Sequence, residues 1–181
     1  MADFFNKVRP NNKSATKMNL SNISPRKTAL VSVFLGFDAF LFDRLHKFFQ
    51  LDIKGWSGGE YAPLTPFLDY VMVWNTGVSY GLLSGFPQPV VMSIVGIAFG
   101  ALLWWWVVSK DFLVRIGLAL CLGGALSNIV DRWLYGAVAD FFHLYVANKS
   151  LFVFNLADTF IFIGAVLLII DAFVPKNKIN I

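Results

Sequence analysis

The chain has 181 residues, of which 57% are hydrophobic and only 14% are charged, and its mean hydropathy is +0.63. A soluble domain carries about a quarter charged residues, so this composition excludes a soluble enzyme and indicates an integral membrane protein. The single cysteine, Cys121, excludes a disulfide framework. The net charge of +4 does not indicate nucleic-acid binding, because six of the 15 Lys and Arg residues precede Leu30.

Four apolar segments are long enough to cross a bilayer, which takes about 20 mostly apolar residues each. They predict transmembrane helices at about residues 28–49, 89–108, 112–129 and 151–174. Residues 1–27 form a basic tail, and residues 175–181 form a second tail. No small-residue cleavage site follows the first segment, so we expect a retained helix rather than a signal peptide.

The positions of the basic residues predict the orientation in the membrane. Lysine and arginine gather in both tails and around Lys110, whereas the segment 50–88 has three acidic residues against one lysine. By the positive-inside rule, both termini face the cytoplasm, and residues 50–88 and 130–150 face outward. Within the first outer segment, the run FLDYVMVW at 67–74 predicts short strands on the membrane surface.

Two aspartates occur where the last spans meet this outer side. Asp140 lies in the outer connection, and we expect Asp158 about two turns into the fourth span, roughly 10 Å below its outer end. An ionisable side chain at membrane depth is costly and by default suggests function. Two carboxyl groups that share a proton supply a general base and a general acid, which is aspartic-protease chemistry and requires no metal.

Other polar residues are predicted at the same depth. Asn155 and Asp158 are three residues apart and therefore project from one helical face. Asn128, Asp131 and Arg132 form a similar group at the outer end of the third span. These spacings predict a polar site to which two helices and an outer loop contribute.

In the first span, Asp43 and Lys47 are separated by four residues, so we expect them to form an ion pair of structural importance. Asp38, five residues earlier, has no partner that the sequence identifies. It stays unassigned.

The residues alone leave several functions open. The acids can form a structural pair, with Asp158 bound to Arg132 and Asp140 capping a helix. They can serve a proton- or ion-coupled transporter, although the chain lacks the repeats and broken helices of transporter folds. An inactive membrane scaffold and the protease described above are the remaining alternatives.

Several ordered motifs resemble the lipoprotein signal peptidases, also called signal peptidase II. They are NTGVSYG at 75–81, GGALSNIVDR at 123–132, GAVADF at 136–141 and FNLAD at 154–158. In addition, DRLHK at 43–47 is similar to that family's Asp-x-x-Ser-Lys element. The resemblance covers about residues 28–174.

This resemblance implies an all-α integral membrane protease with four transmembrane helices in residues 28–174. It also implies a small extracytoplasmic β-rich cradle in residues 50–88 and a short periplasmic helix within residues 132–150. Such an enzyme resides in the bacterial inner membrane with both termini cytoplasmic and its active site toward the periplasm. It removes the signal peptide from diacylglyceryl-modified prolipoproteins by cleaving before the lipidated cysteine.

The matching motif positions imply the site residues. Asp140 and Asp158 match the catalytic pair of the family. The polar residues around substrate and active site are Asn75, Asn128, Arg132 and Asn155, and the structural pair is Asp43 and Lys47. No metal or cofactor is implied. The expected partners are the lipid-modified prolipoprotein and membrane lipids, without nucleic acid, and we expect a monomer.

Three positions depart from the family pattern. Ser127 replaces a common glycine before Asn128, which predicts looser helix packing there. His46 replaces a serine before Lys47, and Tyr80 replaces a common phenylalanine. None of the three is one of the two aspartates, so we expect them to affect specificity rather than the reaction.

Overall fold

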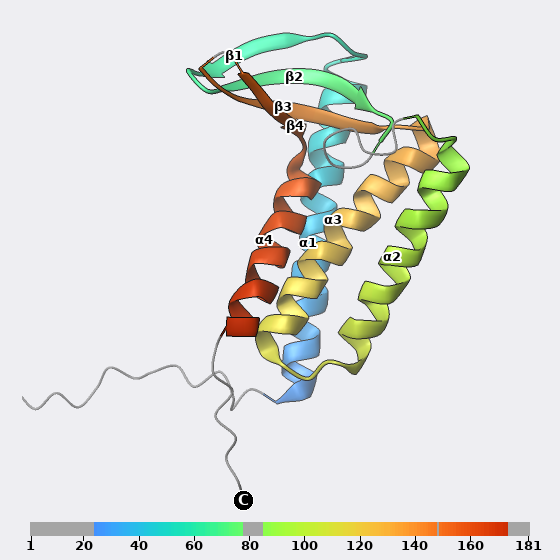
Figure 1. The fold of residues 1–181 in the computed structure, drawn as a ribbon, viewed down its shortest axis with the longest axis vertical. Helices are drawn as coiled ribbons and strands as arrows, with labels where there is room; N and C mark the ends of the chain where they lie inside the picture. Colours follow the sequence, from blue (N-terminus) through green and yellow to red (C-terminus); the bar gives the residue numbers. More distant parts are fainter. Residues whose placement is uncertain (1–23, 78–84, 148, 174–181) are drawn as a thin grey trace, which may run out of the picture.

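The computed structural model describes residues 24–77, 85–147 and 149–173, which form a helical bundle with a small sheet across one end (Figure 1). The described helices are α1 (Pro25–Phe48), α2 (Gln88–Val108), α3 (Phe112–Tyr135) and α4 (Leu156–Phe173). The strands are β1 (Tyr61–Thr65), β2 (Leu68–Asn75), β3 (Val138–Val146) and β4 (Lys149–Phe154). A π-helical turn, η3 (Phe49–Ile53), follows α1 directly.

Three of the described helices, α2, α3 and α4, are long and apolar enough to cross a membrane. The remaining helix, α1, has 24 residues but carries several charged side chains in its second half. Its composition alone therefore does not qualify it as a membrane span. The first residue of α1 and the last of α4 lie at the same end of the bundle, opposite the sheet (Figure 1). Three of the four predicted spans therefore meet the composition of a membrane helix.

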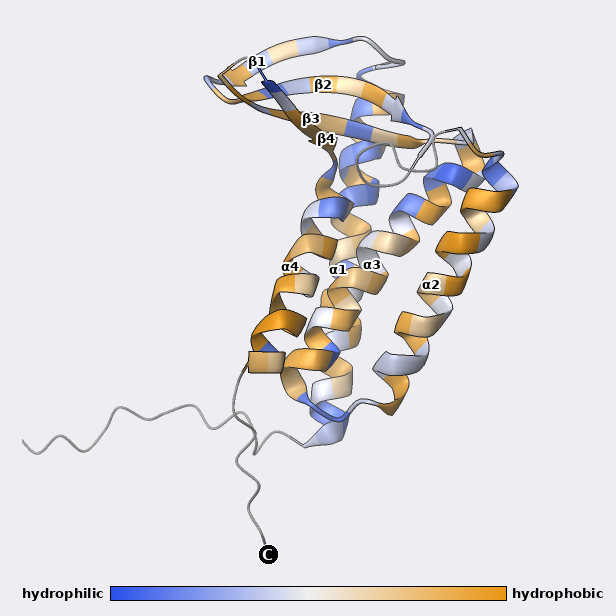
Figure 2. Cartoon of the chain, in the orientation of Figure 1, coloured by the Kyte–Doolittle hydropathy of each residue, from blue (hydrophilic) through white to orange (hydrophobic). Residues whose placement is uncertain are grey.

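The bundle is apolar outside and polar inside. Large apolar side chains such as Ile97, Trp104 and Phe162 are exposed, whereas Asp43 and Lys47 are fully buried. Hydrophilic residues gather where the helices approach the sheet (Figure 2). This distribution suits hydrocarbon as the solvent, because an apolar exterior costs nothing in lipid.

Glycines allow the backbones of α1, α3 and α4 to approach closely. A Cβ atom on Gly123 would collide with the carbonyl oxygen of Gly36 in α1, and one on Gly117 would lie 2.8 Å from the carbonyl oxygen of Gly164 in α4. Small residues at helix contacts are typical of membrane proteins, where packing replaces the hydrophobic driving force. The central helix, α3, is consequently fixed between its two neighbours.

The sheet is antiparallel with strand order β1-β2-β3-β4, and its inner face has an aromatic core. Met72, Ala139 and Phe141 are buried there, with Trp56 and Tyr70 packed against them. Strand β2 coincides with the run from which strands were predicted, so that prediction is confirmed. The aromatic and β-branched composition of β2 and β3 suits a half-buried pleated surface.

The structure corrects several predictions for the outer side. The described part of residues 132–150 contains the end of α3, strand β3 and the start of β4 instead of a separate short helix, because the aromatic run at 141–146 pairs with β2. The protein is therefore not all-α. Helix α4 begins at Leu156 rather than at 151, because residues 149–154 form β4 and pair with β3. Helix α3 continues to Tyr135, beyond the predicted end at 129. Gly136, at φ 73°, ends α3 in the left-handed conformation that glycine favours.

Candidate active site

A groove of about 710 Å³ lies among α2, α3, α4 and β4, beside the sheet end of the bundle. Its polar lining is Asn75, Asn128, Arg132 and Asp158, and the rest of the wall is mainly apolar. Figure 1 shows the helices that bound it, with α2 in green and α4 in red. Four of the polar residues expected from the sequence thus line one cavity.

Asp140 is held on an interior strand of the sheet. It lies in β3, opposite Val73 of β2, and is buried. Its carboxylate accepts hydrogen bonds from the side-chain amides of Asn75 at 3.0 Å and Asn155 at 2.7 Å. Because β3 pairs with β2 at this position, the sheet fixes the backbone of Asp140.

Asp158 lies in the first turn of α4, not two turns into it as predicted. Its backbone N–H donates to the side-chain oxygen of Asn155 at 2.9 Å, and its carboxylate accepts from the backbone N–H of Asn155 at 3.2 Å. This reciprocal pair is the capping-box arrangement at a helix N-terminus. The local sequence therefore sets both the start of α4 and the position of the Asp158 carboxylate.

Two asparagine amides connect the aspartates. Asn128 donates to Oδ1 of Asp158 at 2.9 Å, and its own oxygen accepts from Asn155 at 3.1 Å. The same Asn155 amide reaches Asp140, so one side chain contacts both halves of the pair. The two carboxyl groups consequently share one hydrogen-bond network.

Burial affects the protonation of Asp140. Desolvation, with the negative charge of nearby Asp158 as a further cause, raises the pKa of Asp140 from 3.8 to about 7. Hydrogen bonds from Asn75 and Asn155 act in the opposite direction and do not cancel the effect. A substantial fraction of Asp140 is therefore protonated near neutral pH.

Arg132 directs its guanidinium toward the groove. It donates to the carbonyl oxygens of Gly77 at 2.6 Å and Asn128 at 3.2 Å. Its buried Nε makes no hydrogen bond with any described residue. The described ion pairs include none between Arg132 and Asp158, so the structural pairing considered from the sequence is not present among the described residues.

Beneath the aspartates lies a buried ion cluster of Asp43, Arg44, Lys47 and Asp131. The ammonium of Lys47 lies 2.7 Å from Asp43 and 2.6 Å from Asp131, and Arg44 donates to Asp131 at 2.5 Å. The ion pair expected between Asp43 and Lys47 is thus present. Sequence reasoning missed the contribution of Arg44, because no local spacing connects it to Asp131.

The ion cluster also holds the backbone beside each aspartate. The N–H of Ala139, which precedes Asp140, donates to Asp131 at 3.1 Å. The N–H of Ala157, which precedes Asp158, donates to Asp43 at 2.9 Å. Lys47, through its hydrogen bond to Asn128 at 3.0 Å, reaches the groove directly. The cluster therefore positions the site as well as stabilising the bundle.

Comparison with known proteins agrees with this geometry. A profile of the family described as signal peptidase (SPase) II matches residues 35–174. The chain belongs to the signal peptidase II family. A lipoprotein signal peptidase of Rhodopseudomonas palustris is 41% identical over 73% of this chain and 82% of its own length. One from Nitrobacter hamburgensis is 38% identical over 83% of this chain and 94% of its own length.

A solved structure also resembles this signal peptidase II. It is a bacterial membrane enzyme determined by the in meso method at 2.3 Å resolution, with a TM-score of 0.71 and 25% sequence identity. The match covers 83% of this chain and 94% of that one. The protein is accordingly a bacterial membrane peptidase, and the aspartic type of its family agrees with two carboxyl groups in one network.

Two departures from the signal peptidase II pattern have structural explanations. The hydroxyl of Ser127 donates to Oδ2 of Asp43 at 2.6 Å, so this serine adds a bond to the ion cluster rather than loosening the packing. His46 has a ring nitrogen 2.6 Å from the Tyr70 hydroxyl and stacks on Phe142, which connects α1 to the sheet. Tyr80 lies outside the described residues.

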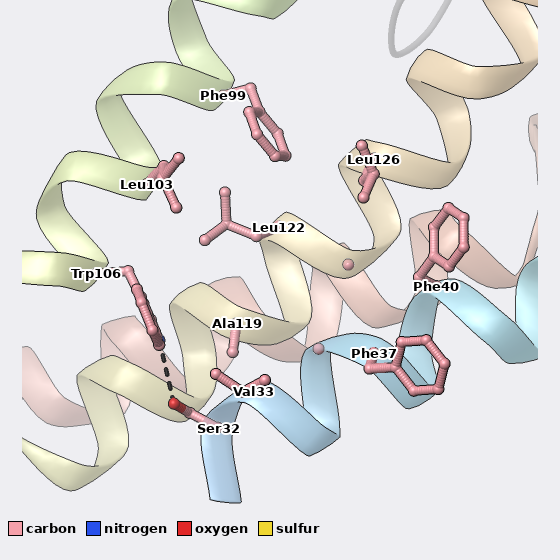
Figure 3. Close-up of a pocket in the computed structure, with 12 residues that line it drawn as sticks. Ser32, Val33, Phe37, Phe40, Phe99, Leu103, Trp106, Ala119, Leu122 and Leu126 are labelled. Carbon is pink, nitrogen blue, oxygen red and sulfur yellow. Dashed lines mark hydrogen bonds between the residues drawn. The ribbon is translucent and has the colours of Figure 1, made fainter. Parts of the chain in front are cut away.

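A second cavity, of about 470 Å³, lies between α1, α2 and α3. Figure 3 shows its aromatic and aliphatic lining, with the Trp106 indole donating to the Ser32 hydroxyl at 3.1 Å. No titratable side chain lines this cavity. It therefore offers no group for acid–base chemistry, and the groove beside Asp158 is the candidate active site of this signal peptidase II.

Proposed function

We propose that this signal peptidase II cleaves diacylglyceryl-modified prolipoproteins before the lipidated cysteine, with Asp140 and Asp158 as its catalytic pair. The protein removes signal peptides from prolipoproteins, as its family membership implies. The observation that carries the assignment of the pair is the contact of Asn155 with both aspartates, one of which, Asp158, lines the groove. Asp140 is buried and joins the same hydrogen-bond network through the side-chain amide of Asn155.

Asp158 suits the role of general base. Its carboxylate lies at the N-terminus of α4, where the helix dipole and the adjacent N–H groups favour negative charge. It also lines the groove, where water can reach it. In this proposal, the ionised Asp158 takes a proton from the water that attacks the scissile carbonyl carbon.

Asp140 suits the role of general acid. Its raised pKa of about 7 keeps a proton available near neutrality. That proton moves to the carbonyl oxygen as the tetrahedral intermediate forms. When the C–N bond breaks, the leaving amine takes the proton that Asp158 removed from water, and Asp140 takes its own proton back from the hydroxyl as the carbonyl re-forms. The amides of Asn75 and Asn155 hold the Asp140 carboxyl in a fixed orientation during both steps.

The remainder of the groove suits the other parts of the substrate. Arg132 lines the groove, and its buried Nε donates to no described residue. Arg132 is therefore placed to donate to a substrate carbonyl oxygen. Below Asp158, the wall is formed by Val95, Ile161, Phe162 and Ala165. Such a surface suits the acyl chains on the substrate cysteine, because apolar groups bind each other without losing hydrogen bonds.

We further propose that α1 is the fourth span of a single protease domain covering residues 28–174. Three of its charged residues support this, because Asp43 and Lys47 are fully buried and Arg44 pairs with Asp131 of α3 inside the bundle. In this arrangement, the tails at 1–27 and 175–181 are cytoplasmic, and the sheet and groove face the periplasm.

A cleavage assay tests the proposed pair. Purified protein in lipid is given a diacylglyceryl-modified prolipoprotein, in parallel with Asp140→Asn and Asp158→Asn, and Asp52→Asn serves as the matched control on the exposed surface of η3. We expect cleavage before the lipidated cysteine by wild type and control, and a loss of at least about a hundredfold in each catalytic variant. Full activity of either catalytic variant would refute the assignment.

An unlipidated prolipoprotein provides the second arm. Equal cleavage rates for lipidated and unlipidated substrates would refute the acyl-chain part of the proposal while leaving the aspartate pair intact.

A further inference from the structure

Asp38 is an acidic residue in the middle of α1 whose side chain is exposed. It lies 13 residues after Pro25, which is about 20 Å along the helix. No hydrogen bond or ion pair joins it to any described residue. A carboxyl group facing hydrocarbon is costly unless another group bonds to it, so its partner is expected outside this chain.

Asp38 belongs to a row of exposed residues with heptad spacing, separated alternately by three and four positions. The flanking members are apolar and between 37% and 59% exposed. The row, which we call the outer stripe, is Val31, Phe34, Asp38, Leu41, Leu45 and Phe48. This spacing keeps a straight seam of side chains along a helix and is the pattern by which helices pair.

The outer stripe is exposed and is not the face that α1 packs against its neighbours. The residues that α1 buries against its neighbours include Ser32, Ala39 and Asp43. At 100° per residue, the outer stripe projects from roughly the opposite side of α1. This heptad row has one polar residue and lies on a face that no described helix or strand covers. It matches the pairing surfaces in which a single polar side chain sets the register.

We propose that the outer stripe is the interface of a parallel homodimer in which the two Asp38 side chains meet. Every copy inserts into the membrane with the same orientation, so identical residues of two copies lie at the same depth. At that depth the carboxyl group of one Asp38 lies within reach of the carboxyl group of the other copy, so the two side chains can bond to each other across the interface. A second copy therefore supplies a hydrogen-bonding group at the depth of Asp38, which lipid tails cannot supply.

The location of the groove is compatible with this dimer. Its described lining residues belong to α2, α3, α4 and three strands, and none of them belongs to α1. A dimer formed through α1 leaves both grooves open to substrate. This inference rests on the proposed role of α1 as a membrane span but not on the proposed catalytic pair, and it departs from the monomer expected on sequence grounds.

Cysteine cross-linking in proteoliposomes tests the interface. In a Cys121→Ala background, Leu41→Cys places a thiol on the outer stripe, and Ile97→Cys places one on the most exposed face of α2 as a matched control. On oxidation, we expect a disulfide-linked dimer from Leu41→Cys that persists as the lipid excess increases. Equal cross-linking of the two variants would overturn the proposal.

Substitution of Asp38 tests the polar contact. We expect Asp38→Leu to weaken dimerisation about tenfold, measured by energy transfer between labelled copies in bilayers, because the inter-helical hydrogen bond is lost. Asp38→Asn retains dimerisation, since two amides can bond to each other. Unchanged thermal melting verifies that both variants are folded. Dimerisation of Asp38→Leu as tight as that of wild type would refute the role of Asp38, as would Asp38→Asn behaving like Asp38→Leu.

Discussion

The backbone N–H of Ala157 donates to the buried carboxylate of Asp43 at 2.9 Å, which anchors α4 to α1 immediately before Asp158. An equivalent bond from Ala139 to Asp131 anchors β3 immediately before Asp140. Lys47 lies between the two carboxylates. The relative position of Asp140 and Asp158 is thus determined by Lys47, although the described ion pairs join Lys47 to neither of them.

Replacement of Lys47 is expected to destabilise the protein strongly. Lys47→Met leaves Asp43 and Asp131 buried without their common partner, and breaking a buried ion pair costs about 3–5 kcal/mol. We expect a large fall in the melting temperature in detergent. Arg44→Met, which removes a side chain that is 18% exposed, is expected to cost less. Equal losses for the two variants would contradict the central role of Lys47.

The hydroxyl of Ser127 is expected to stabilise the same cluster. Ser127→Ala removes its 2.6 Å bond to Asp43, and a hydrogen bond to a charged group contributes about 1.5–3 kcal/mol. Ser93→Ala on α2, whose hydroxyl bonds only to its own helix, is the control and is expected to be nearly neutral. Denaturant or thermal unfolding of the two variants measures the difference. If both variants are neutral, the hydroxyl is not a stabilising donor.

Close helix packing predicts that substituting a glycine changes stability at some helix positions and not at others. Gly123→Ala forces a methyl group against the backbone of Gly36, so we expect it to displace α1 and cost about 1–3 kcal/mol. Gly96→Ala on α2 meets no atom within 4 Å, and its higher helix propensity makes it neutral or stabilising. Melting temperatures of the two variants provide the comparison. A stable Gly123→Ala protein would show that the α1–α3 contact is looser than described.

The raised pKa of Asp140 predicts a pH-dependent stability. Between about pH 4 and 7, folded Asp140 keeps a proton that the unfolded chain has released, so its contribution to the free energy of unfolding falls as pH rises. The slope is at most about 1.4 kcal/mol per pH unit. Relative to Asp140→Asn, wild type is therefore expected to lose stability across this window. A difference between their melting temperatures that does not change with pH would refute the shift.

Asn155 is expected to have two separable roles. Asn155→Ala loses the helix cap, at about 1 kcal/mol, and also the contact that orients Asp140, so kcat is expected to fall about a hundredfold. Asn155→Ser keeps a cap but is too short to reach Asp140. We therefore expect the serine variant to recover thermal stability without recovering kcat. Recovery of both would mean that the cap alone determines the activity.

The sequence predicted those features that depend on local periodicity. Residues 88–108 form α2 almost as expected, the run at 67–74 lies in the sheet, and Asp43 pairs with Lys47. The motif residues converge on one groove, although their catalytic roles stay a prediction.

The missed features depend on contacts between distant segments. A run such as FFHLYV has both helical and strand character, and only pairing with β2 decides that it forms β3. The bond between Arg44 and Asp131 joins residues 87 positions apart. Periodicity identifies the face of a helix that is buried, but it does not identify the residue on the other side.

The close glycine contacts of α3 have a consequence for how the sequence can vary. Helices α2 and α3 have similar hydropathy, 2.1 and 1.8, yet α2 buries only Val91, whereas α3 buries residues along its whole length. Half of the 24 residues of α3 are buried, and they include the glycines in close backbone contact and the residues bonded to the ion cluster. A comprehensive substitution library would therefore be depleted throughout α3 and permissive along α2, and the two helices would diverge at very different rates under the same selection.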